Sequence, residues 1–536
     1  MTALPPLGTF WPTVPDLGFS IPERFNVAEF FVNRNLAEGR GAQVALICGG
    51  RQITYGQIAQ EVDQAANAFS AVGIQPADRV FLLLLDSPAF VSAFWGATKI
   101  GAVPIPANTL LGAEELEFMW KDSRARCLVV DASLLEKVRP ILACQPTDSS
   151  DGPVTTYVAG GTGSAEGVLN FEQELARQPR QAETARTHRD DPAFWLYTSG
   201  STGRPKAAIH LHRDCVYCYE LYAKRVLKIS SSDRTFSTSK LFFAYGLGNA
   251  LYFPFGAGAS TVLLAEKPTP ERVFETLTRH RPTIFFAVPS VYAALVDSAE
   301  VPEGAFNSVR CAVSAGEALP APIWERCRAR FGLSILDGIG STEMLHMFIS
   351  NRLDDMVPGS SGTPVPGYQA KIVDELGRET APGQIGELMV RGESAAAGYW
   401  ERPELTAATF QGEWTATGDK YYRDARGYYW YSGRSDDMMK VSGMWVSPLE
   451  VESAMLAHPA VAECAVVGVA DSSGLVKPKA FFVAKTGAPP GELEAELEDF
   501  LRMRLPHYKL PKWLVRVNSL PRTATGKVQR FKLRGL

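Results

Sequence analysis

Residues 197–206 read YTSGSTGRPK and directly follow AFWL, an apolar stretch typical of a buried strand. Small residues allow the backbone to turn tightly, so that backbone N–H groups and side-chain hydroxyls can face a polyphosphate. Lys206 adds a positive charge on a long side chain. The stretch predicts a phosphate-binding loop after a strand. Its residues are Thr198, Ser199, Gly200, Ser201, Thr202, Gly203 and Lys206.

Other phosphate-binding and hydrolase motifs are absent from the sequence. The pattern G-x-x-x-x-G-K-[ST] of Walker A loops does not occur, nor do G-x-G-x-x-G and G-x-S-x-G. Their absence weakens dinucleotide-binding and α/β-hydrolase interpretations. The stretch VAGGTGSAEG (158–167) is equally rich in glycine but has no lysine, and we expect it to be a surface loop.

The first third of the chain alternates between helix and strand patterns. Apolar residues recur at helical spacing over 58–72, and Gly73 follows where a helix would end. Continuous apolar runs at 80–85 and 127–131 predict buried strands, with a helix expected over 90–101 between them. This order predicts βαβ units and a parallel sheet.

Composition and charge exclude several classes of protein. With 54 Lys+Arg against 58 Asp+Glu, the net charge of the 536 residues is −4, which argues against a nucleic-acid-binding protein. The apolar run at 80–85 is far shorter than the ~20 residues that span a bilayer. The Pro-rich N-terminus lacks the pattern of a signal peptide. We therefore expect a cytoplasmic protein without a membrane partner.

The eight cysteines are widely spaced, which indicates reduced thiols. Cys215 and Cys218 have the C-x-x-C spacing of a half zinc site or a redox pair. No second pair follows, and the run around them has a helical pattern, so we expect the two sulfurs to pack in the interior.

The C-terminal end of the chain is strongly basic. Residues 500–536 contain ten Lys or Arg and no Asp or Glu. A basic segment after an acidic body favours a separate lid that meets phosphates, although a solvated surface gives the same composition.

Five further motifs follow the phosphate loop in order. They are SAGEALP (314–320), DGIGSTE (337–343), TATGD (415–419), GRSDDMMKVSG (433–443) and PRTATGK (521–527). Together with residues 198–206 they make the chain resemble the ANL family of adenylate-forming enzymes. The sequences of these motifs are most similar to those of benzoate–CoA and other aryl-CoA ligases. The resemblance implies an α/β fold with a large multi-subdomain N-terminal body (1–433) and a small mobile α+β C-terminal lid domain (434–536).

The resemblance also implies roles for residues of these motifs. Glu343 offers the carboxylate that Mg²⁺ prefers, and Thr342 can donate to the α-phosphate of ATP. Asp419 can accept both ribose hydroxyls, and Arg434 can reach the ribose or a phosphate. Lys527 would stabilise charge on the α-phosphate, and its charge makes it a candidate for regulation by acetylation. Gly316, Glu317 and Asp337 are similar to the wall beside adenine in relatives.

The resemblance to the ANL family implies a second half-reaction with CoA, for which the lid turns relative to the body. Asp436 matches the hinge, and the residues expected to line the CoA tunnel are Lys440, Ser442, Gly443 and Trp445. Glycine suits a position where a pantetheine arm passes close to the backbone.

The acid-binding pocket is expected between LFFAYGLGN (241–249) and GIGSTEMLHMF (338–348). Phe243, Ala244 and Tyr245 form an apolar wall that offers nothing to an ammonium group, so an α-amino acid is disfavoured. Gly338 and Gly340 are expected to leave a flat slot for a ring. His346 either touches the carboxylate or a ring substituent, or is a packed core histidine.

The sequence predicts an ATP-dependent aryl-CoA ligase that uses Mg²⁺ and CoA and acts on a small aromatic acid, as a monomer or homodimer. An enzyme that loads an aryl acid onto a carrier protein and a non-catalytic nucleotide-binding relative are the alternatives. The preferred benzoate derivative, the thiol base and the pathway stay open at this point.

Overall fold

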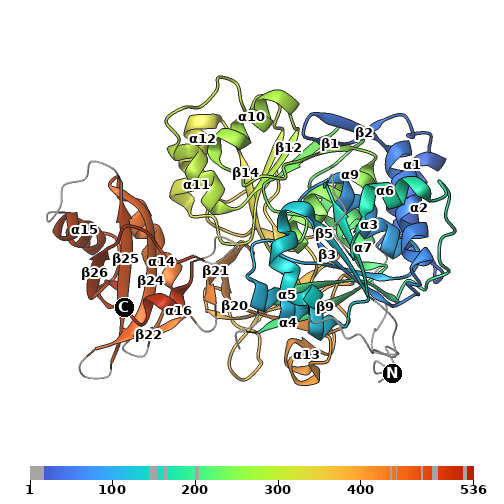
Figure 1. Cartoon of the computed structure of the whole chain (residues 1–536). Helices are drawn as coiled ribbons and strands as arrows, with labels where there is room; N and C mark the ends of the chain where they lie inside the picture. The colour runs from blue at the N-terminus through green and yellow to red at the C-terminus, as the bar shows by residue number, and fades with distance from the viewer. Residues whose placement is uncertain are drawn as a thin grey trace.

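The computed structural model describes residues 17–143, 154–161, 167–199, 204–434, 437–441, 444–471, 475–485, 493–522 and 528–536. Figure 1 shows a large body and a smaller C-terminal part, which lies to one side and begins after β21 (Tyr429–Arg434). Both parts contain helices and strands. The predicted α/β class is confirmed.

The helix α2 (Tyr55–Ala71) shows how the sequence pattern becomes structure. The hydroxyl of Thr54 accepts a hydrogen bond from the Gln57 N–H, and the Gln57 side chain accepts one from the Thr54 N–H, which caps the helix. Gly73 follows the helix at φ +83°, a conformation that glycine adopts without steric cost. The buried face consists of Ile58, Val62, Ala65 and Phe69, as the helical spacing predicts.

A five-stranded parallel sheet packs beside this helix in the order β4-β3-β5-β6-β7. The helix α3 (Pro88–Lys99) connects two of these strands, so the predicted βαβ arrangement is confirmed. The prediction that 158–167 is entirely a surface loop is wrong at its start, because Val158 and Ala159 are buried in β6. The strands are β3 (Arg79–Leu83), β4 (Val103–Pro106), β5 (Cys127–Asp131), β6 (Thr155–Ala159) and β7 (Leu169–Asn170).

A second, nine-stranded sheet has the order β16-β15-β14-β13-β12-β10-β11-β1-β2. The strands β14, β13, β12, β10, β11 and β1 are parallel, whereas β2 is antiparallel to β1. The helices α10 (Pro270–His280), α11 (Pro289–Asp297) and α12 (Ala321–Phe331) gather beside this sheet (Figure 1). Ligands of such sheets bind beyond the carboxyl ends of the strands, where β14 carries Asp337. The strands are β1 (Val44–Cys48), β2 (Arg51–Thr54), β10 (Arg234–Ser237), β11 (Ser260–Leu263), β12 (Ile284–Ala287), β13 (Cys311–Ser314), β14 (Ile335–Gly340), β15 (Met347–Ser350) and β16 (Thr363–Pro364).

Two antiparallel units complete the body. In the first, β8 (Pro192–Ser199) and β9 (Pro205–Leu211) pair, and each contains residues of the phosphate-loop sequence. A five-stranded sheet contains β17 (Gln369–Val373), β18 (Gly386–Arg391), β19 (Phe410–Gln411), β20 (Trp414–Arg423) and β21. Because β21 leads into the C-terminal part, this second unit joins the two parts of the molecule (Figure 1).

The C-terminal part has its own apolar core, which includes Val451, Val466, Phe482 and Leu497. Much of its basic charge is neutralised internally, since at least six cations of residues 500–536 form ion pairs with acids of the C-terminal part. Its elements are β22 (Met439–Val441), β23 (Met444–Val446), α14 (Pro448–Leu456), β24 (Val461–Ala470), β25 (Val476–Ala484), α15 (Leu493–Arg502), β26 (Trp513–Arg516) and α16 (Arg530–Leu533).

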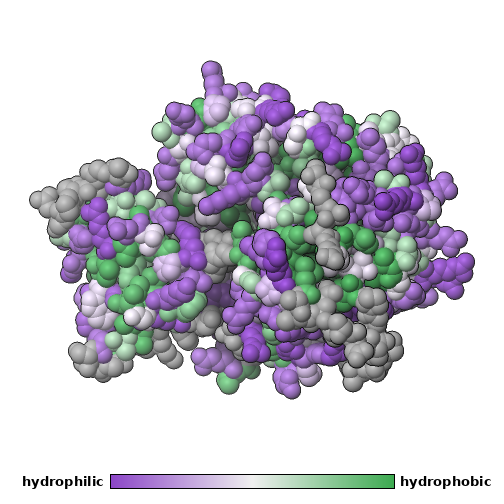
Figure 2. All heavy atoms as spheres, in the orientation of Figure 1, coloured by the Kyte–Doolittle hydropathy of each residue, from purple (hydrophilic) through white to green (hydrophobic). Residues whose placement is uncertain are grey.

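Polar side chains are spread over both parts on the face that Figure 2 shows. No helix among the described residues is long and apolar enough to cross a bilayer. Cys215 and Cys218 lie in α7 (Asp214–Cys218) with both side chains buried, which confirms that they pack in the interior.

Gly338 and Gly340, which are expected to leave a flat slot for a ring, lie in β14 beside the antiparallel strand β15. A Cβ atom at Gly338 would lie 2.6 Å from the Ile349 carbonyl oxygen, and one at Gly340 would lie 2.5 Å from that of His346. The backbone of β15 and the residue before it fills the space that side chains would need. These glycines therefore allow β14 and β15 to pack closely.

Gly338→Ala is expected to lower the midpoint of thermal unfolding, because the new methyl group must displace the backbone of β15 at a cost of ~1–3 kcal/mol. Gly41→Ala is the matched control, since its Cβ would meet only Leu36 Cδ2 at 3.5 Å. Differential scanning calorimetry of both variants provides the comparison. A Gly338→Ala variant with unchanged thermal stability and a selective loss of aromatic-acid binding would restore the slot interpretation.

Candidate functional site

Residues from both ends of the phosphate-loop sequence lie on β8 and β9. Thr198 lies directly across from Lys206 in the ladder, and Ser199 lies across from Pro205. The strand predicted before the loop is present and extends to Ser199. The loop residues Gly200, Ser201, Thr202 and Gly203 lie outside the described residues.

Lys206 and Glu343 meet at the hydroxyl of Tyr399. The Lys206 ammonium donates to Tyr399 Oη at 2.6 Å, and this hydroxyl donates to Glu343 Oε1 at 2.6 Å. The direct distance between Lys206 Nζ and Glu343 Oε1 is 3.8 Å. Burial lowers the pKa of Lys206, with a further contribution from Arg434, while Glu343 acts in the opposite direction. The two charged groups that the sequence assigns to ATP and Mg²⁺ are thus adjacent.

Thr342 lies in a tight turn between β14 and β15. Its carbonyl accepts hydrogen bonds from the Leu345 N–H at 3.1 Å and from His210 Nε2 at 2.8 Å. Leu345 has φ +65°, a strained conformation that its full burial maintains. His210 is itself held by the Asp214 carboxylate at 2.9 Å. Buried hydrogen bonds therefore fix the backbone that presents Thr342 and Glu343.

Asp419 and Arg434 are neighbours on the antiparallel strands β20 and β21. Arg434 Nη1 donates to Asp419 Oδ1 at 3.1 Å and to the Thr417 carbonyl at 3.1 Å. Gly418, at φ +72°, allows this approach, since a Cβ there would lie 2.9 Å from Arg434 Nη2. Arg434 also lowers the pKa of Lys206. The Asp419–Arg434 pair therefore lies in the same electrostatic environment as Lys206, Tyr399 and Glu343.

Asp337 connects β14 to the segment that contains Gly316 and Glu317. Its Oδ2 accepts from the Leu319 N–H at 3.2 Å, and burial raises its pKa to about 7. Gly316 has φ +92°, so the turn before Glu317 favours glycine. Asp337 therefore braces the segment of residues 316–319 against the sheet.

The predicted acid-pocket residues lie on and before α8 (Ala244–Leu247). Phe243 precedes the helix, and the Tyr245 hydroxyl donates to the Val313 carbonyl at 3.3 Å, which fixes its ring. Ala244 and Tyr245 are both partly buried against the main core.

His346 lies behind Tyr245, with the ring centroids 5.5 Å apart. It is 3% exposed, its Nε2 is 3.1 Å from Asn249 Oδ1, and burial lowers its pKa to about 3. The imidazole is neutral at physiological pH and is enclosed by Tyr222, Tyr252 and Phe253. The structure favours the packed core histidine among the two alternatives.

The residues expected to serve the second half-reaction are less completely described. Asp436, Ser442, Gly443 and Lys527 lie outside the described residues. Lys440 and Trp445 are paired in the ladder of the short β22–β23 hairpin. Asp437, beside the expected hinge, forms an ion pair with Arg534 at 2.7 Å.

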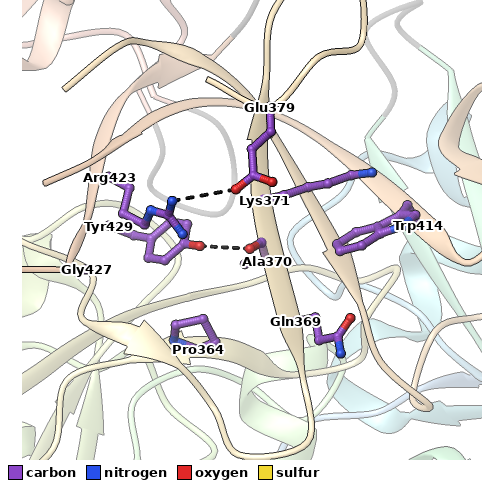
Figure 3. A pocket seen from close by; sticks show the side chains of 9 residues that line it. All are labelled: Pro364, Gln369, Ala370, Lys371, Glu379, Trp414, Arg423, Gly427 and Tyr429. Atoms are coloured by element: carbon purple, nitrogen blue, oxygen red, sulfur yellow. Dashed lines mark hydrogen bonds and ion pairs between the residues drawn. The ribbon is translucent and has the colours of Figure 1, made fainter. Parts of the chain in front are cut away.

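A pocket of about 450 Å³ lies elsewhere, on the sheet that contains β17 and β20 (Figure 3). Lys371 Nζ lies 4.1 Å from the ring centroid of Trp414, and Arg423 pairs with Glu379 at 3.6 Å. None of the predicted nucleotide or acid residues lines it. The pocket therefore lies apart from the predicted nucleotide and acid residues.

Sequence reasoning missed Tyr399, His210 and Asn249. Tyr399 is 193 residues from Lys206 and 56 from Glu343, so no local spacing signals their contact. Its stretch GYWERPELT (398–406) matches no catalytic or phosphate-binding motif. The pairing of distant segments creates its position.

Comparisons with known proteins show which family the chain belongs to. Residues 34–400 match the family model "AMP-binding enzyme", and residues 450–527 match "AMP-binding enzyme C-terminal domain". Benzoate–CoA ligase of Thauera aromatica is 50% identical over 96% of each chain. The structure of the anthranilate CoA ligase AuaEII in complex with anthranoyl-AMP superposes with a TM-score of 0.92 at 43% identity, covering 96% of this chain and 98% of the other.

The structure of a benzoate CoA ligase from Burkholderia xenovorans LB400 is also similar, with a TM-score of 0.88 and 43% identity over 95% of this chain and 100% of the other. The matched family models and these relatives extend over the body and the C-terminal part alike. They agree with the order of motifs from the phosphate loop to the C-terminal end. The chain belongs to the AMP-binding enzymes, the ANL superfamily of adenylate-forming enzymes.

Proposed function

We propose that the chain is an AMP-forming aryl-CoA ligase for benzoate or a small substituted benzoate. An oxygen of the substrate carboxylate attacks the α-phosphorus of ATP, and the bond to the bridging oxygen breaks to release pyrophosphate. The sulfur of CoA then attacks the acyl carbon of the aryl-AMP, and AMP leaves. The observation that carries this proposal is the meeting of Lys206 and Glu343 beside Asp419 and Arg434 in a chain half identical to a benzoate–CoA ligase.

The proposed nucleotide site uses both charged pairs. The turn after Thr198 and the ammonium of Lys206 would hold the phosphates, and Thr342 would donate to the α-phosphate. Asp419 would accept the ribose hydroxyls, with Arg434 beside it to reach the ribose or a phosphate. The adenine would lie along the segment braced by Asp337, which includes Gly316 and Glu317.

A magnesium ion would accompany ATP at Glu343. Within the described residues no group of three or more His, Cys, Asp or Glu side chains is placed to hold a metal. Mg²⁺ often binds through one or two carboxylates together with substrate phosphates, so a single glutamate fits this ion. When bound, the ion neutralises phosphate charge and favours departure of pyrophosphate.

The acid pocket suits an aromatic ring. Phe243 and Tyr245 provide apolar surface. The hydrogen bond from the Tyr245 hydroxyl to the Val313 carbonyl makes the Tyr245 part of that surface rigid. The neutral His346 behind Tyr245 offers no positive charge to a substrate carboxylate. We assign Phe243, Ala244 and Tyr245 to contact with the ring and His346 to the support of Tyr245.

The C-terminal part, residues 434–536, is proposed to act as a mobile lid on the body formed by residues 1–433. In the adenylating pose Lys527 would stabilise charge on the α-phosphate. Rotation about Asp436 would then remove Lys527 and bring Lys440, Ser442, Gly443 and Trp445 to the CoA tunnel. The separate apolar core of the C-terminal part supports movement as a unit.

Benzoate, 2-aminobenzoate or 4-hydroxybenzoate is expected to be preferred over acetate, cinnamate, octanoate and phenylalanine. Acetate forfeits burial of the ring, which is expected to lower kcat/KM by about 10–200-fold. Pyrophosphate release measured with each acid is the assay, repeated with and without CoA. A clear preference for octanoate or phenylalanine would overturn the assignment of the pocket.

Lys527→Ala is expected to reduce adenylate formation strongly and to spare thioester formation from supplied aryl-AMP. The reason is that this lysine acts on phosphate charge only while the lid is in its first pose. Single-turnover measurements of each half-reaction separate the two effects. Equal losses in both half-reactions would contradict the role assigned to Lys527.

Asp436→Pro is expected to show the opposite pattern, with aryl-AMP formed and the CoA thioester lost. Proline fixes φ near −65°, so a hinge residue that must change its dihedral angles is arrested. The same single-turnover assays apply, with retention of fold checked by calorimetry. An unimpaired overall rate would show that Asp436 is not the hinge.

A further inference from the structure

Residues 397–400 form a short extended segment along β9. The Ala397 N–H donates to the Ile209 carbonyl at 2.9 Å, the Ile209 N–H to the Gly398 carbonyl at 3.0 Å, and the Trp400 N–H to the Ala207 carbonyl at 2.9 Å. These bonds bracket Tyr399 and place it beside the strand that carries Lys206. The position of the Tyr399 backbone relative to that strand is therefore fixed.

The Tyr399 side chain is held as firmly as its backbone. It is 5% exposed, and its ring packs on Phe410 with centroids 5.6 Å apart and on the small Ala208 and Ala396. Burial raises the pKa of Tyr399, and the Glu343 carboxylate adds to this effect. The phenol therefore stays protonated and has one hydrogen to donate.

The hydroxyl forms hydrogen bonds with both charged groups. It donates to Glu343 Oε1 and accepts from Lys206 Nζ, each at 2.6 Å. Lys206 and Glu343 are left 3.8 Å apart, beyond hydrogen-bonding distance. Within the described residues Glu343 Oε2 accepts no hydrogen bond. The phenol thus takes the place of a direct hydrogen bond between the two charged groups.

A direct hydrogen bond between the Lys206 ammonium and the Glu343 carboxylate would work against nucleotide binding. If the hydroxyl were absent, Lys206 Nζ and Glu343 Oε1 would be free to close the gap and form a charge-assisted hydrogen bond. Mg·ATP would then have to break that bond before the ammonium reached a phosphate and the carboxylate reached the ion. The hydroxyl avoids this cost by satisfying both groups while it keeps them separate.

We propose that Tyr399 is a positioning residue of the nucleotide site, whose hydroxyl keeps Lys206 and Glu343 apart and directs each toward Mg·ATP. This inference rests on the proposed function, since that function assigns Lys206 to the phosphates and Glu343 to Mg²⁺. The phenol itself contacts neither the substrate acid nor the reacting atoms. Its effect is on binding of the metal–nucleotide complex.

The test compares Tyr399→Phe with Tyr429→Phe. Both variants keep the ring. Tyr399→Phe removes the hydrogen bonds to Glu343 and from Lys206, whereas Tyr429→Phe removes the one to the Ala370 carbonyl at 2.8 Å, in the separate pocket of Figure 3. Isothermal titration calorimetry with Mg·ATP in the absence of acid measures Kd. Hydrogen bonds to charged groups contribute ~1.5–3 kcal/mol, so Tyr399→Phe is expected to raise this Kd by about 10–100-fold and Tyr429→Phe to leave it unchanged.

Two further measurements separate positioning from a structural role. The Mg²⁺ concentration for half-maximal pyrophosphate release should rise in Tyr399→Phe, while KM for benzoate and the thermal midpoint match those of Tyr429→Phe. In a Lys206→Gln background, Tyr399→Phe should change Kd less than about threefold, because its partner charge is gone. Equal effects in both backgrounds, or an unchanged Kd, would overturn the proposal.

The two proposals fail in different ways. A wild-type protein that binds Mg·ATP but releases no pyrophosphate with any benzoate would refute the ligase assignment, while the calorimetric comparison would still support Tyr399. A Tyr399→Phe variant that loses thermal stability and weakens benzoate and Mg·ATP alike would assign Tyr399 a structural role and refute the inference.

Discussion

The hydrogen bonds between residues 397–400 and β9 are the constraint on which the nucleotide site depends. They bring together Lys206, which follows the phosphate loop, and Tyr399, which lies 193 residues later. The Ala396 N–H in turn donates to the Glu343 carbonyl at 2.8 Å, so the same segment also holds the turn after β14. One backbone pairing therefore aligns three stretches of the chain that have to act on one ligand.

Charge in this site is partly desolvated before any ligand arrives. Burial lowers the pKa of Lys206, and Arg434 lowers it further, so the positive charges there are held at a cost. Opposite charges on Glu343 and Asp419 offset that cost in the two clusters. A polyphosphate with Mg²⁺ carries both signs of charge and matches this arrangement, which supports the proposed binding of Mg·ATP.

In the basic C-terminal end (500–536) and in the proposed acid pocket, the charge differs from what the sequence suggests. At least six cations of residues 500–536 pair with acids of their own part of the molecule, so composition overstated the positive surface that a lid would offer. His346 is buried, neutral and bonded to Asn249, so the acid pocket gains shape from it rather than charge. In the proposed function, selectivity for a ring would come from apolar surface and rigidity.

The sequence by itself determined the α/β class, the parallel βαβ units and the order of the motifs, because helical and strand periodicities and local turn residues are written within a few residues of one another. It also predicted that Lys206, Glu343, Asp419 and Arg434 belong to one site. Only the tertiary structure decided that Gly338 serves close strand packing, that His346 is a core residue and that Tyr399 joins Lys206 to Glu343. Those facts depend on which backbone or side chain from a distant segment fills the space beside a residue, and no local pattern encodes that.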